Sequence, residues 1–169
     1  ASEQYKLNFA LIATPAEGLS GRFTKIDKKV YGQLKGITDK EYYTNSFHIP
    51  VNHPISWYDK IALEGAYHQY CNGGHITYVE MASPPMGNVE AMETLVRHMA
   101  DSGIGYAGVN FPIDFCTGCG FQGVINQERC PVCMRSGIRR VRRITGYFST
   151  VDRFNDAKKA ELRQRISHF

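Results

Sequence analysis

Two closely spaced pairs of cysteines constrain the fold of this 169-residue chain more than any other feature. The pairs are CTGC at 116–119 and CPVC at 130–133. Each CxxC turn presents two sulfurs from one loop, and two such turns complete the tetrahedral thiolate shell that zinc prefers. We therefore expect a structural zinc site with the ligands Cys116, Cys119, Cys130 and Cys133. A redox dithiol, an iron–sulfur cluster and a rubredoxin-like iron site are the alternatives.

Four protein ligands leave the metal no open position, so its expected role is to hold the shape of the chain. The first residues lack the charged-then-apolar pattern of a secretion signal. Paired cysteines without such a signal favour metal over disulfides and a reducing compartment, and we expect a cytoplasmic protein. The fifth cysteine, Cys71, is expected to be a small buried apolar residue, with a reactive thiol as the alternative.

The length of the chain allows one domain with a hydrophobic core, or such a domain plus a small metal-binding module. The sequence contains no run of about 18 apolar residues, so we expect no membrane-spanning helix. The net charge is +4, and arginines concentrate at 135–143. Such a cluster can bind phosphate or nucleic acid. The alternative is a solvated or intersubunit face.

Apolar periodicity along the chain predicts strands that alternate with helices. The predicted elements are strands at 7–13, 75–81 and 106–111, an extended segment at 39–51, and helices from Thr14, at 56–70, at 88–102 and at 161–169. Alternation of this kind indicates an α/β architecture. The units are too few to close a barrel of eight or ten strands, so any barrel would be only partly encoded here.

Gly146 follows the second cysteine pair within the segment RITGYF at 143–148. A turn is the default role of a glycine. This segment and the RFNDAK that follows at 153–158 resemble the C-terminal signature of the anaerobic (class III) ribonucleoside-triphosphate reductases. In that family an RVxGY pattern precedes a Phe-Asn-x-x-Lys stretch, and a four-cysteine zinc module lies just upstream; Ile144 stands here in place of the valine. Segments 13–23, 42–51 and 110–114 resemble the same family, so the resemblance extends over the whole chain.

The resemblance implies part of a ten-stranded glycyl-radical-enzyme α/β barrel. Residues 1–112 would be the C-terminal part of the barrel, 113–138 a zinc-ribbon module, and 139–169 the glycyl radical loop with a C-terminal helix. Gly146 would store a radical that a radical-SAM iron–sulfur activating enzyme installs. A Cα radical needs a planar centre that its flanking amides share, and a side chain would obstruct it.

The family forms its thiyl radical on a cysteine well upstream of this segment, and Cys71 does not match it. The resemblance therefore implies a C-terminal piece or split subunit of an oxygen-sensitive enzyme that reduces ribonucleoside triphosphates to deoxyribonucleotides. The implied partners are the activating enzyme, the upstream portion of the reductase and a ribonucleotide substrate. The complete enzyme is expected to be a homodimer, with no membrane and no direct nucleic-acid binding.

Residues 14–17, TPAE, carry a helix-start signal: threonine as N-cap, proline in the first position and an acid in the first turn. Free N–H groups at a helix N-terminus bind phosphate. The resemblance implies that Thr14, Ala16 and Glu17 line the nucleotide site, although Glu17 alternatively only caps the helix. Asn45 and Ser46, with His48 nearby, either line the active site, bond to the radical loop or satisfy the core.

Two other functions are consistent with parts of the sequence. A zinc-ribbon module that binds nucleic acid through Arg139 to Arg143 would not need the strand–helix units that precede the cysteines. A spare glycyl radical domain, which repairs an oxygen-damaged partner, would need Gly146 but not the TPAE and YTNSFH segments at 14–17 and 43–48.

Overall fold

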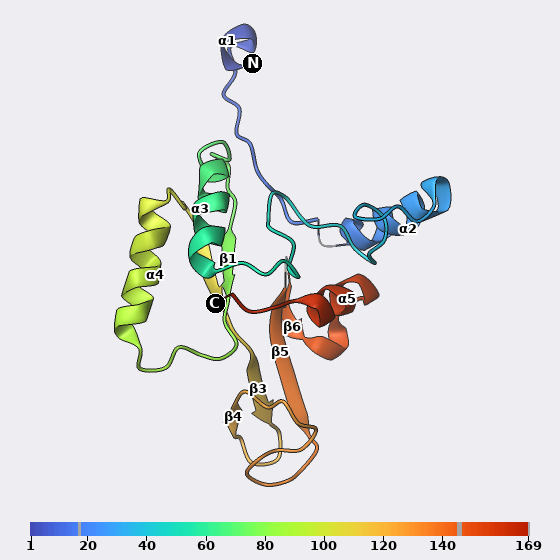
Figure 1. Ribbon diagram of the computed structural model, residues 1–169, viewed down its shortest axis with the longest axis vertical. Helices are drawn as coiled ribbons and strands as arrows, with labels where there is room; N and C mark the ends of the chain where they lie inside the picture. The colour runs from blue at the N-terminus through green and yellow to red at the C-terminus, as the bar shows by residue number, and fades with distance from the viewer. Residues whose placement is uncertain (17, 145–146, 169) are drawn as a thin grey trace.

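The computed structural model describes residues 1–16, 18–144 and 147–168. The chain has an elongated shape with an α/β body in the middle (Figure 1). The short helix α1 (Ser2–Tyr5) lies at the end of an N-terminal arm, and the loops that carry the cysteines form the opposite end. The element order confirms a mixed α/β architecture.

The body is built around the unit α3 (Trp57–His68), β1 (Thr77–Glu80), α4 (Val89–Asp101) and β2 (Ala107–Asn110). Strands β1 and β2 pair in parallel, and Glu80 lies opposite Asn110 at the end of the ladder. Side chains of the two helices and of β1 form one buried apolar cluster: Ile61, Val79, Leu95 and Met99. All four elements fall within predicted ranges.

Local capping explains where these two helices begin. The Ser56 hydroxyl accepts the backbone N–H of Asp59 at 3.0 Å, and the Asn88 side chain accepts that of Ala91 at 3.1 Å. Each side chain satisfies an N–H group that has no partner within its own helix. After α4, Gly103 has φ +76°, a left-handed conformation that glycine adopts without strain.

A second sheet has four antiparallel strands in the order β4-β3-β5-β6. The strands are β4 (Gln122–Gly123), β3 (Ile113–Cys116), β5 (Ile138–Ile144) and β6 (Tyr147–Thr150). Strand β5 pairs with β3 on one side and with β6 on the other. The sheet therefore continues across the predicted module boundary between 138 and 139.

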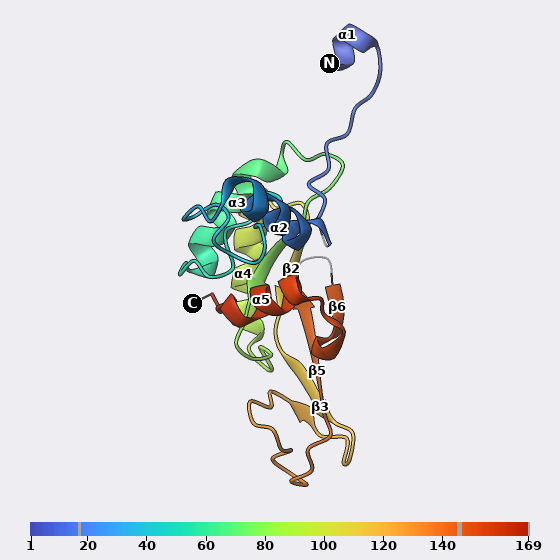
Figure 2. The ribbon, with the colours of Figure 1, turned by 90° about the vertical axis from the view of Figure 1, so that its right-hand side faces the viewer.

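Helices α2 (Leu19–Tyr31) and α5 (Asp156–Gln164) pack together beside the second sheet, and the 3-10 turn η1 (Val151–Arg153) leads into α5 (Figure 2). Gly21 allows this close approach, since a Cβ there would lie 2.3 Å from the Ala157 Cβ. Tyr42, Ala157 and Ala160 form the associated buried cluster.

Three sequence-based predictions of local structure are wrong. Segment 7–13 is not a strand and makes only an isolated bridge between Ile12 and Gly74. Segment 39–51, expected to be extended, instead bends at 39–42 and turns at 46–47. The last helix spans 156–164 rather than 161–169, because the backbone after it bonds elsewhere: the N–H of Ile166 donates to Val51 and that of His168 to Glu80.

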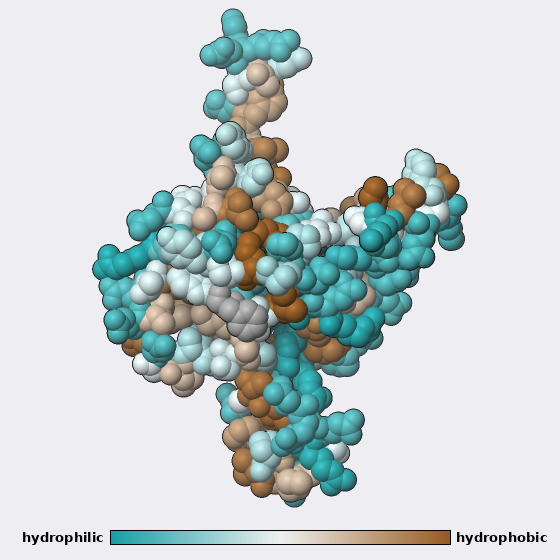
Figure 3. Space-filling model, viewed as in Figure 1, coloured by the Kyte–Doolittle hydropathy of each residue, from teal (hydrophilic) through white to brown (hydrophobic). Residues whose placement is uncertain are grey.

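Apolar side chains are exposed along the N-terminal arm and on α2 (Figure 3). Leu7, Phe9, Leu11 and Ile12 are each more than half exposed. Among the described helices none is long and apolar enough to cross a membrane.

Candidate functional site

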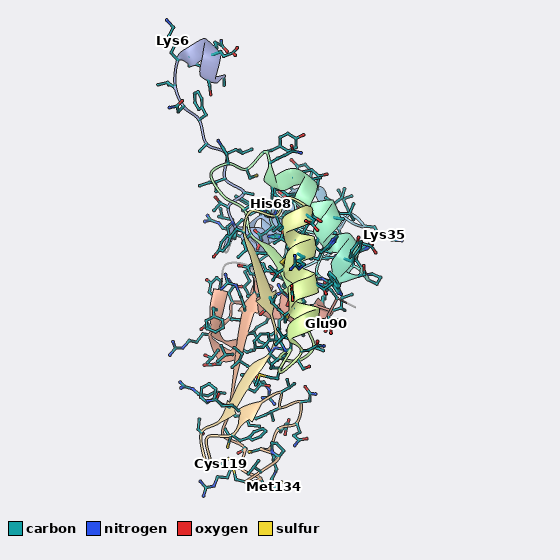
Figure 4. All side chains as sticks on the ribbon, turned by 90° about the vertical axis from the view of Figure 1, so that its left-hand side faces the viewer. Lys6, Lys35, His68, Glu90, Cys119 and Met134 are labelled. Carbon is teal, nitrogen blue, oxygen red and sulfur yellow. The ribbon has the colours of Figure 1, made fainter. Side chains whose placement is uncertain are left out.

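The four predicted cysteine ligands converge at the tip of the second sheet. The Cys116 Sγ lies 3.5 Å from that of Cys133, and the Cys119 Sγ lies 3.6 Å from that of Cys130. All four sulfurs lie within 4.8 Å of one another. Tetrahedral zinc with bonds of about 2.3 Å needs sulfurs roughly 3.8 Å apart. The donor set and its spacing therefore fit zinc, and Cys119 lies at the end of the molecule opposite Lys6 (Figure 4).

Backbone N–H groups point at the sulfurs, as expected for thiolate ligands. The N–H of Gly118 donates to Cys116 Sγ at 3.3 Å, and that of Val132 donates to Cys130 Sγ at 3.4 Å. The Gly118 bond is the main reason why the pKa of the Cys116 thiol is lowered. Gly120 has φ +75°, which lets the chain reverse directly after Cys119.

A buried ion pair joins the cysteine loops to the sheet behind them. Asp114, which is fully buried on β3, binds the Arg142 guanidinium on β5 with both carboxylate oxygens. One of these oxygens also accepts the N–H of Ile125 at 2.9 Å. The carboxylate therefore fixes the loop between the cysteine pairs to both strands.

The arginines of β5 are engaged within the chain. Arg140 donates to the Gln127 carbonyl at 2.7 Å, and Arg143 donates to the Tyr78 hydroxyl. Arg139 stacks over the Phe115 ring at 5.8 Å. Of these four arginines, Arg142 forms an ion pair with Asp114, while the contacts of the other three have neutral partners and orient their side chains within the chain.

Gly146 and Thr145 lie outside the described residues, but the chain on both sides of them is well fixed. Ile144 is 1% exposed and is the register partner of Tyr147. The Arg143 carbonyl accepts the Asn110 amide at 3.0 Å and lies 3.4 Å from an Arg165 nitrogen. Strand β5 is thus tied to β2 and to the C-terminal tail immediately before Gly146.

The predicted nucleotide-site residues that are described come together, although not at a helix start. The Asn45 side chain accepts the Ala16 N–H at 2.6 Å, and the Ser46 hydroxyl lies 3.5 Å from the Thr14 carbonyl oxygen. Helix α2 begins only at Leu19, so the predicted N-cap role of Thr14 is wrong: Asn45 takes up the Ala16 N–H. Glu17 lies outside the described residues.

A buried polar cluster around Glu80 was missed by the sequence reasoning. Arg165 binds Glu80 and Glu161, and the Asn110 amide donates to Glu80. Burial raises the pKa of Glu80 even though Arg165 opposes that shift. Residues 80, 110 and 165 share no motif or short spacing, so only the fold brings them together.

A second missed cluster lies between α3 and β1 and contains His48, Glu64 and His75. Lys60 on α3 is bonded to Glu64. Only this pair could have been predicted from the sequence, because residues spaced i,i+4 lie on one helix face. Burial acts to raise the pKa of Glu64, but His48 and Lys60 outweigh it and lower that pKa to about 2. Burial lowers the pKa of His75 to about 4. Cys71 lies three residues after α3 and is a free thiol of intermediate exposure, so the expectation that it is buried is wrong.

Comparison with known proteins gives one consistent match. A family model described as anaerobic ribonucleoside-triphosphate reductase matches residues 1–168. Curated relatives with that name include one from Enterobacteria phage T4, 36% identical over 99% of this chain and 29% of the relative. A second, from Escherichia coli (strain K12), is 38% identical over 98% of this chain and 24% of the relative. The chain therefore spans about a quarter of the length of these relatives.

Solved structures show the same fold. One anaerobic ribonucleotide reductase superposes with a TM-score of 0.78 at 24% identity, over 99% of this chain and 26% of its own. The Thermotoga maritima enzyme with MES in the active site superposes with a TM-score of 0.71 at 25% identity, over 91% of this chain and 24% of its own.

Proposed function

This chain belongs to the family of anaerobic ribonucleoside-triphosphate reductases, and from that premise we propose that it carries the radical-storage site of such an enzyme at Gly146. The observation that carries the proposal is the position of this glycine. It lies two residues after a strand that is buried at Ile144 and bonded at Arg143 to two other parts of the fold. A stored radical must return to one place at every turnover, and a fixed flanking strand serves that need.

The four cysteines would hold zinc as a structural ion, which supplies no redox chemistry and has no open coordination position. Their role would be to hold the backbone in place. Cys116 is the last residue of β3 and the register partner of Ile138, the first residue of β5. A metal at this end would fix the start of the strand that ends at Ile144.

Thr14, Ala16, Glu17, Asn45 and Ser46 would form part of the nucleotide site. Four of these residues lie together, and Asn45 is 6% exposed while its side chain bonds to the Ala16 backbone. Asn45 would then act mainly by holding the turn at 14–16 in shape for the substrate.

This chain would need the remaining part of the reductase for turnover. Leu19, Phe23, Ile26 and Val30 are all exposed on α2, and their spacing places them on one face of the helix. An unpartnered apolar face of this kind marks an interaction surface, and we assign it to the rest of the ten-stranded barrel. Residues 1–112 would contribute to that barrel, 113–138 would form the zinc module and 139–169 the radical loop and terminal helix.

The proposed reaction is the one that the family resemblance implies. A radical-SAM enzyme would remove a hydrogen atom from the Gly146 Cα, and the stored radical would generate a thiyl radical on an upstream cysteine. The thiyl radical would take the 3′ hydrogen of the ribonucleotide, and the 2′ hydroxyl would be protonated and leave as water. An external donor, formate or a thiol protein, would supply the two electrons of the reduction, and the 3′ hydrogen would be returned from the cysteine. Cytoplasmic location and a homodimeric complete enzyme belong to the same proposal.

Anaerobic activation followed by electron paramagnetic resonance tests this proposal. The chain, its activating enzyme and the upstream portion of the reductase should give a glycyl doublet that a Gly146→Ala variant lacks. Gly105→Ala is the matched control, because a Cβ at Gly105 would meet no atom within 4 Å, and it should keep the doublet. No signal after confirmed activation, or an unchanged signal in Gly146→Ala, would overturn the assignment.

A further inference from the structure

A cluster of potential metal ligands outside the cysteine site lies in the body of the molecule. His48 precedes α3, Glu64 lies on α3 and His75 lies two residues before β1. One ligand atom from each lies within 4.8 Å of the other two. Figure 4 places His68, the last residue of α3, far from Cys119 at the tip, so this cluster is separate from the four cysteines.

Several of the converging atoms have no hydrogen-bond partner among the described residues. Both ring nitrogens of His75 and the Oε2 of Glu64 are buried in this way. The His75 residue is 5% exposed and Glu64 is 1% exposed. A buried polar atom without a partner costs about 1–3 kcal/mol. One bound ion can satisfy Glu64 Oε2 and one His75 ring nitrogen, while the other ring nitrogen keeps the proton of the neutral imidazole.

The neighbouring polar side chains do not fill this role, because they have their own partners. His68 Nδ1 accepts the Gly105 N–H at 3.3 Å, so in the neutral ring Nε2 carries the proton and donates to the Thr77 hydroxyl at 2.9 Å. Lys60 donates to Glu64 Oε1 at 2.6 Å and leaves Oε2 free. His48 Nδ1 lies 3.7 Å from Oε2, beyond hydrogen-bond distance.

We propose that His48, Glu64 and His75 bind a divalent metal ion of the zinc class as a second site. Imidazole and carboxylate together suit zinc, and two histidines with one glutamate form a known three-ligand zinc set. Glu64 would bind the ion through Oε2, while Oε1 stays with Lys60 as an outer partner that orients the carboxylate. The fourth coordination position is left for water or another ligand.

The geometry requires only a small adjustment. Zinc with bonds of about 2.0–2.1 Å holds its ligand atoms roughly 3.3 Å apart. Atoms that now lie within 4.8 Å must therefore close by about 1.5 Å at most. The centroids of the His48 and His75 rings lie 4.7 Å apart with their planes tilted by 38°, and the Phe47 ring packs on His75 at 3.7 Å between centroids. The positive charge of Lys60 repels a bound cation, so we expect a lower metal affinity here than at the four-cysteine site.

The test loads the full chain with metal and needs no enzymatic activity. Zinc is first bound to the thiolates, and Co²⁺ is then added to the same protein without oxygen. We expect a second equivalent of metal, with visible cobalt bands but no sulfur-to-cobalt charge-transfer band. His75→Gln should lose only this second equivalent, and the control His53→Gln, which alters an exposed loop histidine, should keep it. A wild-type chain that binds one equivalent would overturn the proposal and leave an ordered water as the bridging group.

Two further measurements do not depend on the folding of the His75 variant. In the wild-type chain bound Co²⁺ should shift the ring proton resonances of His48 and His75 but not those of His53; equal shifts of all three would contradict the site. In Lys60→Met the buried Glu64 loses its cation partner, so the chain should be destabilised without metal and restabilised by Co²⁺. Destabilisation that Co²⁺ leaves unchanged would also count against the site.

Discussion

Residues 57–110 and residues 113–150 are both built from short strands, yet different interactions hold them together. The first region encloses Ile61, Val79, Leu95 and Met99 between two helices and a parallel strand pair. Within the described residues, neither buried apolar cluster takes a member from 113–150. That region depends on four sulfurs at its tip and on the buried pair of Asp114 with Arg142.

This difference indicates which region should stay folded when the metal is removed. A region with an apolar core folds by burying area from water, and it should survive chelation. A region organised by ligands and ion pairs depends on the metal for its free energy of folding. Strand β5, which leads to Gly146, belongs to the second kind, so its order should depend on the cysteines.

Metal removal should have the largest effect. In small zinc modules the bound ion contributes about 10–16 kcal/mol of apparent binding free energy. Chelation, or Cys116→Ser with Cys133→Ser, should therefore unfold 113–138 and leave α3 and α4 folded. Hydrogen exchange resolved by residue should show fast exchange in β3 and unchanged protection in β1. Equal loss of protection in both strands would refute the separation of the two regions.

Leu95→Ala tests the other half of the comparison. Leu95 is 2% exposed within the apolar cluster, and a buried leucine replaced by alanine costs about 2–5 kcal/mol. Urea unfolding followed by helix circular dichroism should show this loss. The metal content of the four-cysteine site should stay unchanged. Exposed Leu63→Ala on the same helix pair is the control and should cost much less.

Asp114→Asn should weaken the cysteine-bearing region without touching a metal ligand. The variant leaves Arg142 without its buried carboxylate, at a cost of about 2–3 kcal/mol. Faster metal loss to a chelator is the expected readout. Glu93→Gln breaks the exposed Arg97–Glu93 pair and should change stability by less than about 0.5 kcal/mol. Similar metal-release rates for the two variants would show that Asp114 does not support the site.

His168 should give a small dependence of stability on pH. Burial lowers the pKa of this ring to about 4, and its Nδ1 accepts the Glu80 N–H. A ring whose folded pKa is depressed stabilises the fold above its unfolded pKa of about 6.5, and the stabilisation is lost as the pH falls toward 4. The loss should be under about 2 kcal/mol, because the ring is partly exposed and water screens its charge. His168→Gln should remove this part of the pH profile; an identical profile would contradict it.

Local signals in the sequence were sufficient for part of this structure. The 3.6-residue periodicity predicted α3 and α4, and the CxxC spacing predicted four convergent sulfurs. The helix-start signal at Thr14 failed because Asn45, distant in sequence, takes up the Ala16 N–H. Tertiary bonds of this kind also end α5 early, through Val51 and Glu80.

The predicted nucleotide residues were grouped by the family resemblance, and the structure brings together Thr14, Ala16, Asn45 and Ser46. Other features had no counterpart in the sequence pattern. Asp114 and Arg142 are 28 residues apart and share no motif. The three side chains at His48, Glu64 and His75 come from separate segments that only the tertiary fold brings together.

The mass of the activated chain after exposure to air tests the location of the radical most directly. Oxygen reacts with a glycyl radical and cuts the backbone there, so the wild-type chain should be cleaved near Gly146 and lose β6 and α5. Gly146→Ala, activated in parallel, should remain intact. An intact wild-type chain after confirmed activation, or equal cleavage in the variant, would contradict radical storage at this glycine.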